Sequence, residues 1–237
     1  MTFGLREHLV QAIVLDIEGT TTPIAFVYDV LFPFARAHLG EYLQQHVDSD
    51  ELREPIRRLS EEWAEEVARG EAPPEPVAGY VEWLMDRDRK SPGLKLLQGQ
   101  IWDRGFRTGE LRGDVFPDVP PALQRWLETD IAVAIYSSGS VQAQRLIFSS
   151  TTSGDLTGCF SRFFDTAVGA KVSSDSYRRI ATELACPVGR TLFVSDVTKE
   201  LDAAQAAGCQ ALLCVRPGNP PQTGSFPVVH GFDEIVS

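Results

Sequence analysis

The stretch Ala12-Ile-Val-Leu-Asp-Ile-Glu-Gly-Thr-Thr21 decides the fold class of this chain. Its first four residues form a short apolar run, which predicts a strand buried on both faces and ending at Asp16. In open α/β sheets the carboxyl ends of the strands carry the ligand site, so Asp16 is expected at such a site. Glu18 adds a second carboxylate, and Gly19 allows the backbone to turn sharply.

Two further apolar runs, at residues 131–136 and 191–194, also end in polar side chains. A pair of serines follows the first run, and small donors at a strand-to-helix turn suit an anion. Because the carboxyl ends of parallel strands meet at one edge of a sheet, we expect a single site from these side chains: Asp16, Glu18, Ser137, Ser138, Lys171, Asp196 and Glu200.

This set of side chains favours metal-assisted phosphate chemistry. Hard carboxylate oxygens, with few histidines and no clustered cysteines, favour Mg²⁺ held partly by water and a substrate phosphate. Once Mg²⁺ and Lys171 compensate the charge of a phosphate, Asp16 can attack phosphorus. Glu18 can then protonate the leaving alcohol and deprotonate the hydrolytic water.

The residues resemble the four ordered motifs of the haloacid dehalogenase-like phosphohydrolases, which usually have aspartate where Glu18 stands. With glutamate at this position, the sequence from Asp16 onward closely resembles the enolase-phosphatase (acireductone synthase) branch of the family, which belongs to methionine salvage. Further matches lie at Asp16 to Val27, Leu97 to Gly99, Ile101-Trp102, Val115 to Ala122, Tyr136 to Val141, Phe164 to Thr166, Ser195 to Thr198 and Val215 to Asn219.

The resemblance implies enolisation of 2,3-diketo-5-methylthiopentyl 1-phosphate followed by removal of its phosphate, with one Mg²⁺ per subunit. It also implies roles for single residues. Asp16, Glu18 and Lys171 would be catalytic, and Ser137, Ser138 and Lys171 would bind substrate. Asp16, Glu18 and Asp196 would bind the metal. Glu200 and Asp202 match the acidic end of the fourth motif, where they would act through a metal-bound water or bind the metal directly.

The order of predicted elements favours a doubly wound α/β core, with a mainly parallel sheet, that carries an inserted cap. Residues 26–112 show mostly helical periodicity, which predicts a four-helix cap between the first and second core strands. Residues 1–25 and 113–237 would form the haloacid dehalogenase-like core, where predicted strands and helices alternate.

Composition narrows the possible partners. The formal charge of -11 argues against nucleic acid or an anionic membrane, and it also disfavours long-range attraction of a phosphate. The small phosphorylated metabolite expected from the resemblance would therefore depend on Mg²⁺ and Lys171. The chain shows no signal-peptide pattern and no apolar stretch near the ~20 residues of a membrane helix, so we expect a cytoplasmic protein. A monomer is also expected. The four scattered cysteines are expected to be buried thiols.

Other interpretations remain open at this point. Asp16 and Glu18 can be ordinary turn carboxylates, Ser137 to Ser140 can be a helix cap, and Lys171 can be a solvated surface charge. The alternative functions are another small-metabolite phosphatase of the same superfamily, a phospho-accepting receiver module, and a halogen-removing relative. The predicted cap argues against a receiver, and Asp196 argues against a dehalogenase.

Overall fold

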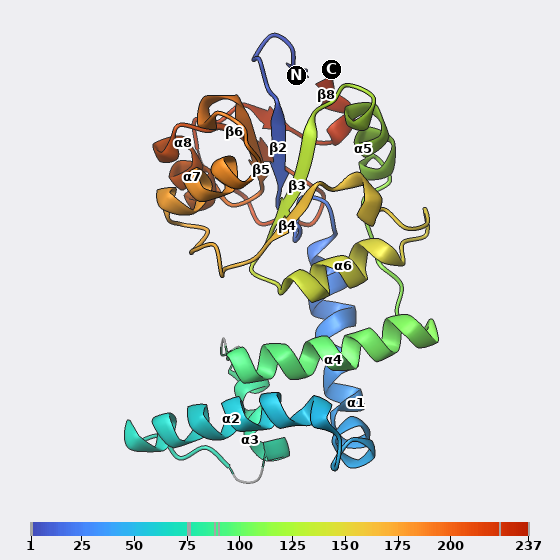
Figure 1. The fold of residues 1–237 in the computed structure, drawn as a ribbon, viewed down its shortest axis with the longest axis vertical. Helices are drawn as coiled ribbons and strands as arrows, with labels where there is room; N and C mark the ends of the chain where they lie inside the picture. Colours follow the sequence, from blue (N-terminus) through green and yellow to red (C-terminus); the bar gives the residue numbers. More distant parts are fainter. Residues whose placement is uncertain (1, 75–76, 88, 90, 223, 237) are drawn as a thin grey trace. The chain divides into compact units, whose positions relative to one another are not determined.

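The computed structural model describes residues 2–74, 77–87, 89, 91–222 and 224–236. The chain divides into two compact units, one formed by residues 1–27 with 112–237 and the other by residues 28–111. The first contains the sheet and is called the core unit, and the second is called the helical unit (Figure 1). The predicted boundaries, at 25/26 and 112/113, lie near this division, and the description of the insertion as a cap stays a prediction.

A six-stranded sheet, with strand order β4-β3-β2-β5-β6-β7 and every neighbouring pair parallel, forms the centre of the core unit. Its first strand in the chain, β2, lies between β3 and β5, so the chain changes winding direction beside β2. Ligands of open α/β sheets bind at such a switch point. The strands are β2 (Ala12–Leu15), β3 (Ala132–Tyr136), β4 (Arg162–Phe164), β5 (Thr191–Ser195), β6 (Gln210–Cys214) and β7 (Val228–Val229).

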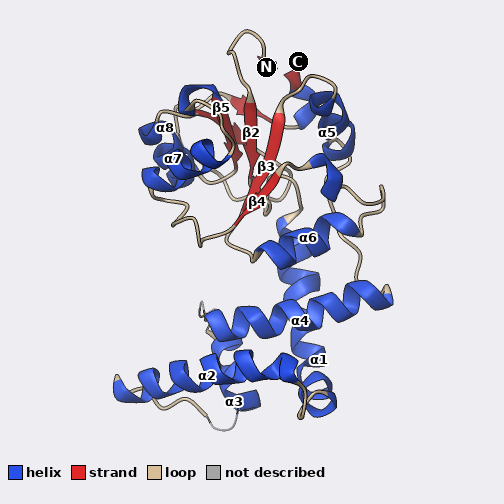
Figure 2. Ribbon diagram, viewed as in Figure 1, coloured by secondary structure: helices blue, strands red, loops and turns tan. Residues whose placement is uncertain are grey.

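Helices cover both faces of this sheet, as Figure 2 shows. On one face, Val14, Tyr136 and Phe193 pack with residues of α7 (Ser174–Glu183) and α8 (Thr198–Ala207) in one buried cluster. Helix α5 (Val119–Leu127) packs against β3, and α6 (Val141–Ser149) packs against β4. The four residues of β2 are buried, as expected for a central strand with a helical layer on either side. The doubly wound α/β prediction is therefore confirmed.

The helical unit contains four α-helices among its described residues: α1 (Phe32–Gln45), α2 (Asp50–Ala68), α3 (Val77–Asp86) and α4 (Pro92–Thr108). The residues at the two ends of α4 explain where this helix begins and ends. The Ser91 hydroxyl accepts a hydrogen bond from the Leu94 amide at 2.9 Å, Pro92 begins the first turn, and Gly109 ends the helix in the left-handed region.

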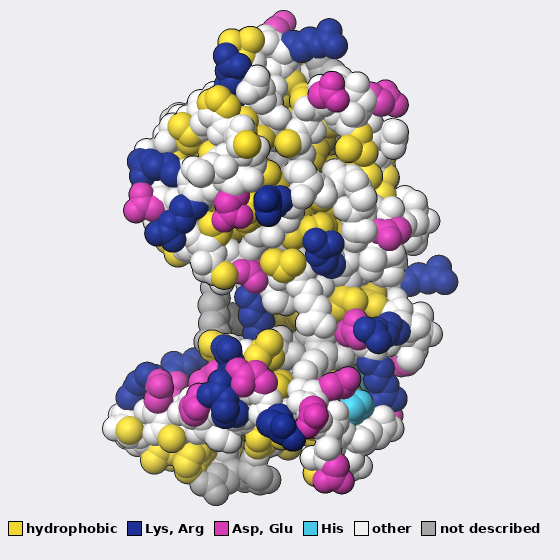
Figure 3. Space-filling view, in the orientation of Figure 1, with side chains coloured by type: hydrophobic (Ala, Val, Ile, Leu, Met, Phe, Trp, Pro, Cys, Tyr) yellow, Lys and Arg dark blue, Asp and Glu magenta, His cyan; other side chains and the backbone are white. Residues whose placement is uncertain are grey.

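The exposed face of α2 carries mixed charge. Arg57 forms ion pairs with Glu54 and Glu61, at 2.8 and 2.6 Å, and Figure 3 shows Lys/Arg and Asp/Glu side chains interspersed where α2 lies. This pattern is typical of a solvated helix surface and offers no continuous basic patch on the face drawn.

Sequence periodicity missed several short elements. Strands β1 (Phe3–Gly4) and β8 (Ile235–Val236) pair in parallel, and the chain passes through a π-helix at Phe26–Leu31 before α1. Two-residue strands carry too little alternation to be recognised. Short 3-10 helices also occur at Thr157–Cys159, Val188–Arg190 and Phe232–Glu234.

The fold bears on two expectations from the sequence, that no helix spans a membrane and that the cysteines are buried thiols. No helix in the described part of the chain is long and apolar enough to span a membrane. All four cysteines are free thiols, but the expectation that they are buried holds only for Cys209 and Cys214. Cys159 and Cys186 are partly exposed, whereas Cys209 packs in the same buried cluster as residues of α7 and α8.

Candidate active site

The Asp16 carboxylate lies at the carboxyl end of β2, and only 2 % of the residue is exposed. Its Oδ1 accepts hydrogen bonds from Lys171 Nζ at 2.6 Å and from the Ile17 amide at 2.7 Å. Its Oδ2 lies 2.9 Å from the hydroxyl of Ser195, at the end of neighbouring β5. Both oxygens are therefore oriented by donors, which a simple turn carboxylate would not need.

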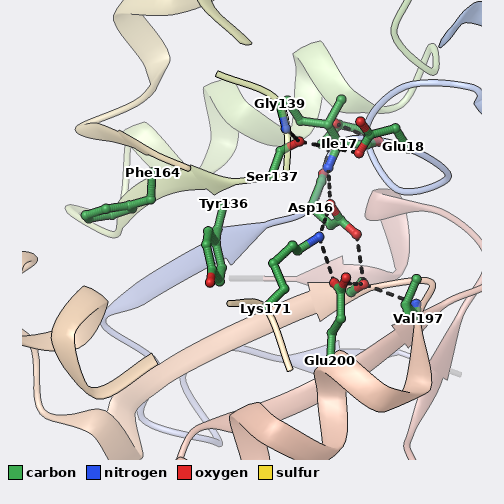
Figure 4. Close-up of polar contacts among 12 residues, drawn as sticks. Asp16, Ile17, Glu18, Tyr136, Ser137, Gly139, Phe164, Lys171, Val197 and Glu200 are labelled. Carbon is green, nitrogen blue, oxygen red and sulfur yellow. Dashed lines mark hydrogen bonds and ion pairs between the residues drawn. The ribbon is translucent and has the colours of Figure 1, made fainter. Parts of the chain in front are cut away.

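Lys171 bridges Asp16 and Glu200, with its ammonium 2.7 Å from Glu200 Oε2 (Figure 4). Only 9 % of Lys171 is exposed, so it is not a solvated surface charge. Burial alone would lower the pKa of Lys171, but the contacts with Asp16 and Glu200 outweigh it and raise that pKa. The backbone carbonyl of Lys171 accepts a hydrogen bond from the Tyr177 hydroxyl at 2.7 Å, which fixes the segment to α7.

Ser195 links the same two carboxylates. Its Oγ lies 2.9 Å from Asp16 Oδ2 and 3.2 Å from Glu200 Oε2, and its single proton can serve only one of them at a time. The amide of Val197 donates to this hydroxyl at 3.1 Å. Ser195 was not in the predicted set of site residues, although its position directly before Asp196 at a strand end was a usable signal.

Glu18 lies near the serine-rich turn after β3 rather than beside Lys171 (Figure 4). The Ser137 hydroxyl is 3.4 Å from Glu18 Oε2 and accepts a hydrogen bond from the Gly139 amide at 3.0 Å. Burial, and then the charge of Asp16, raise the pKa of Glu18. A carboxyl group with a raised pKa is suited to giving and taking protons.

The serine-rich turn contains both a cap and candidate ligands. Ser140 caps α6, accepting from the Ala143 amide at 3.2 Å, whereas Ser137 faces Glu18 and Ser138 is exposed. The buried Gln144 amide donates to the carbonyls of Gly139 and Phe164, at 2.9 and 2.8 Å. Gln144 thus connects the turn to the end of β4, a contact that was not predicted from the sequence.

Asp196 approaches the Gly19 turn from the end of β5. Gly19 has φ of 73°, and a Cβ built there would lie 2.4 Å from Asp196 Oδ2, so the expected need for glycine is confirmed. Burial, followed by the charge of Asp16, raises the pKa of Asp196 to about 7. Among the described residues, the buried Asp196 Oδ1 has no hydrogen-bond partner.

These carboxylates outnumber the nearby positive charge. Burial, and then the charge of Asp16, raise the pKa values of Glu18, Asp196 and Glu200, and Lys171 is the cation that acts against this rise. The pKa of Glu200 is raised to about 7. The unpartnered Asp196 oxygen and the excess of negative charge fit a site that takes a cation.

The donor set restricts which cation fits. In the described parts of the chain, no three His, Cys, Asp or Glu side chains come together as a preformed metal cage. Mg²⁺ does not need one, because it commonly uses one or two carboxylates and completes its shell with water and substrate oxygens. Two strand-end aspartates therefore suit Mg²⁺ better than Ca²⁺ or Zn²⁺.

Known proteins resemble the chain over almost its whole length. The family profile described as haloacid dehalogenase-like hydrolase matches residues 10–208. Enolase-phosphatase E1 of Synechococcus elongatus is 45 % identical over 233 residues, which cover 95 % of this chain and 98 % of that protein. Enolase-phosphatase E1 of Cronobacter sakazakii is 47 % identical over 230 residues, 96 % of this chain and 97 % of the relative.

A solved structure has the same fold. The UTR4 protein of Saccharomyces cerevisiae superposes with a TM-score of 0.77 at 29 % identity, covering 94 % of this chain and 99 % of that one. The strand-end acids, the buried lysine, the sheet order and these similarities agree. The chain belongs to the haloacid dehalogenase-like hydrolases and, within them, to the enolase-phosphatase E1 family.

Proposed function

We propose that this enzyme enolises 2,3-diketo-5-methylthiopentyl 1-phosphate and then removes its phosphate, giving the acireductone of methionine salvage. The observation that carries the phosphatase half is the buried Asp16 carboxylate, with Lys171 Nζ at 2.6 Å from Oδ1 and Ser195 Oγ at 2.9 Å from Oδ2. A carboxylate held by donors on two sides has the fixed orientation that an attacking nucleophile requires.

The proposed metal is one Mg²⁺ per subunit, held by Asp16, Asp196 and Glu18, the last through its side chain or its backbone carbonyl. The unpartnered Oδ1 of Asp196 supports this choice. When bound, Mg²⁺ would neutralise phosphate charge and polarise the oxygen on which negative charge develops. Glu200 would hold Lys171 and Ser195 in place, and the exposed Asp202 has no proposed role.

The phosphoryl transfer would take place in two displacements at phosphorus. An Asp16 oxygen attacks the phosphorus, the bond from phosphorus to the substrate oxygen breaks, and Glu18 gives its proton to that leaving oxygen. Water then attacks the phosphorus of the aspartyl phosphate, Glu18 takes a proton from the water, and the bond to Asp16 breaks. Ser137, Ser138 and Lys171 would bind the transferring phosphate.

Enolisation would precede this transfer, and the two activities in the name of the curated relatives support including it. A base removes a proton from the carbon that carries the phosphate, the electron pair moves to the neighbouring carbonyl, and its oxygen gains a proton. We propose Glu18 as that base. Its raised pKa and its place beside Ser137, two residues from Asp16, suit both half-reactions.

The roles of the helical unit, the cellular compartment and the oligomeric state complete the proposal. The helical unit would act as a cap that excludes water and selects the substrate. The enzyme would work in the cytoplasm as a monomer on a free metabolite, without nucleic acid or membrane as partner.

The test is to supply the diketo phosphate with Mg²⁺ and to follow enol absorbance and inorganic phosphate separately. Wild type should give both products in sequence. Asp16→Asn, which is nearly isosteric, should stop phosphate release and accumulate the enol phosphate, whereas Asp202→Asn on the exposed face of α8 should retain both activities.

Two results would contradict the proposal. Release of phosphate from many monoesters without any enol would leave only the alternative, another small-metabolite phosphatase of the superfamily. Full phosphate release by Asp16→Asn would exclude the covalent step.

A further inference from the structure

Two segments that the proposed reaction does not use, Val115–Ala122 and Val215–Asn219, meet at the loop after Asp16. The Asn219 side-chain amide donates to the Gly19 carbonyl at 2.8 Å, and Arg216 Nε donates to the Thr20 carbonyl at 3.1 Å. The amide of Phe116 donates to the Thr21 carbonyl at 3.0 Å. Three consecutive carbonyls of one loop are therefore held from outside it.

The two side chains of the second segment are held at a fixed spacing by a tight turn. The backbone amide of Asn219 donates to the Arg216 carbonyl at 3.2 Å. Pro217 and Gly218 occupy the central positions of the turn, and Gly218 has φ of 88°. Proline followed by glycine in the left-handed region is typical of a type II turn. The side chains are thus presented together, at low entropic cost, to neighbouring carbonyls.

Arg216 is itself firmly placed. Only 5 % of it is exposed, its Nη1 donates to Asp118 Oδ1 at 2.8 Å, and its guanidinium lies 4.3 and 4.8 Å from the ring centres of Phe116 and Phe232. The ion pair with Asp118 and the contacts with two aromatic rings leave Arg216 little freedom to follow a moving loop. These contacts therefore fix the orientation of the Arg216 guanidinium.

The loop itself has internal bonds but few of them fix its position in the core unit. The amides of Thr20, Thr21 and Thr22 all donate to the Ile17 carbonyl, and the Gly19 amide donates to the Thr22 carbonyl. These bonds close the loop on itself. The loop lies close to both Asp196 and Asn219. A Cβ built on Gly19 would lie 2.4 Å from Asp196 Oδ2 and 3.0 Å from Asn219 Nδ2.

We propose that Asn219 and Arg216 are positioning residues that hold the Gly19–Thr20 backbone against Asp196 and thereby fix the relation between the Asp16–Glu18 segment and the end of β5. The kinetic part of this inference rests on the proposed function. The placement of the loop does not, and it can be measured alone.

The chemistry predicts which kinetic constant changes. The groups proposed to bind phosphate, Ser137, Ser138 and Lys171, come from other segments and do not touch Asn219 or Arg216 in the contacts described. The loop carries Glu18 and adjoins Asp16 and Asp196. Loosening it should lower kcat and weaken Mg²⁺ binding while leaving KM nearly unchanged.

The experiment compares Asn219→Ala and Arg216→Lys with Gln210→Ala in the full-length protein. Gln210, at the opposite end of β6, also donates its amide to two backbone carbonyls, of His8 and Gly189, but lies away from the site. Hydrogen exchange of the amides in residues 16–22, Mg²⁺ binding by calorimetry, kcat and KM are measured well below the unfolding temperature.

Loss of a neutral hydrogen bond should speed exchange in residues 16–22, and lower kcat, by roughly 2- to 10-fold for Asn219→Ala. Arg216→Lys keeps a charge near Asp118 but loses the planar donor to Thr20, so roughly 10-fold or more is expected. Gly218→Ala, whose Cβ meets nothing within 4 Å, strains only the turn and should act in the same direction. Gln210→Ala should leave all four measurements unchanged.

The outcomes separate the two levels of inference. Unchanged exchange in residues 16–22 of both variants would overturn the positioning role. Faster exchange with unchanged kcat and Mg²⁺ affinity, or with a raised KM alone, would overturn its link to the chemistry. If wild type forms no enol, the proposed function fails, while the exchange and calorimetry still decide whether Asn219 and Arg216 hold the loop.

Discussion

Raising the pH of the metal-free enzyme is expected to destabilise it, because carboxylates at the site must ionise without enough positive charge. Burial, then the charge of Asp16, raises the pKa values of Asp196 and Glu200 to about 7. In the unfolded chain both values return to about 4. The folded state therefore binds more protons than the unfolded state between about pH 4 and pH 7, and the free energy of unfolding falls as pH rises through that window.

The magnitude follows from the size of these shifts. One carboxylate raised by about 3 pKa units costs about 4 kcal/mol of stability once it is fully ionised. Asp16 contributes to both shifts, so the effects overlap, and we expect about 3 to 5 kcal/mol for the pair between about pH 5 and pH 8. In a protein of this size that loss lowers the unfolding temperature by about 10 °C.

Other ionisable groups do not reverse the sign in this window. The raised pKa of Lys171 means that its stabilising contribution is complete at every pH below its ordinary value near 10.5. Carboxylates with lowered pKa values, such as Glu54 and Asp155, gain their effect above their unfolded values and lose it only below about pH 4.

The assay is urea unfolding followed by circular dichroism, after removal of divalent cations, at a series of pH values. Asp196→Asn and Glu200→Gln should each flatten the profile, whereas Asp202→Asn, an exposed acid on the same helix as Glu200, should not. Adding Mg²⁺ at about pH 8 should restore most of the lost stability by compensating the ionised carboxylates. A profile that is level or rises between pH 5 and pH 7 would refute the reasoning that this site needs a cation.

Three substitutions test single side chains. Glu18→Gln should suppress both enol formation and phosphate release by roughly 10²- to 10⁴-fold; a normal rate of enol phosphate accumulation would place the enolising base elsewhere. Ser195→Ala removes the donor to Asp16 Oδ2, so kcat should fall roughly 10- to 100-fold, with circular dichroism unchanged; an unaltered kcat would make this contact incidental. Lys171→Met leaves Asp16 and Glu200 without the ammonium that contacts both, so urea unfolding near neutral pH should show a loss of about 3 to 5 kcal/mol; equal stability to wild type would show that those carboxylates are solvated.

The sequence by itself determined the central strands and the position of the site at their carboxyl ends. Apolar runs of four to six residues that stop at Asp16, Ser137 and Ser195 identified these strands, because a buried parallel strand has no alternating pattern and stops where polar groups begin. The apolar runs predicted at 131–136 and 191–194 match β3 and β5 to within one residue. Gly19 was identified from its residue type alone, because few other residues accept a positive φ.

Only the tertiary structure decided which groups touch. Lys171 is 155 residues from Asp16 and Ser195 is 179 residues from it, and nothing local in the sequence specifies that one donor meets each carboxylate oxygen. The same holds for Gln144 on the Phe164 carbonyl and for Arg216 and Asn219 on the Gly19 loop. Such contacts depend on strand order and on the register between β2, β3 and β5, which long-range pairing sets and local periodicity does not encode. The sequence therefore determined which residues can do the chemistry, and the fold determined which of them hold the others in place.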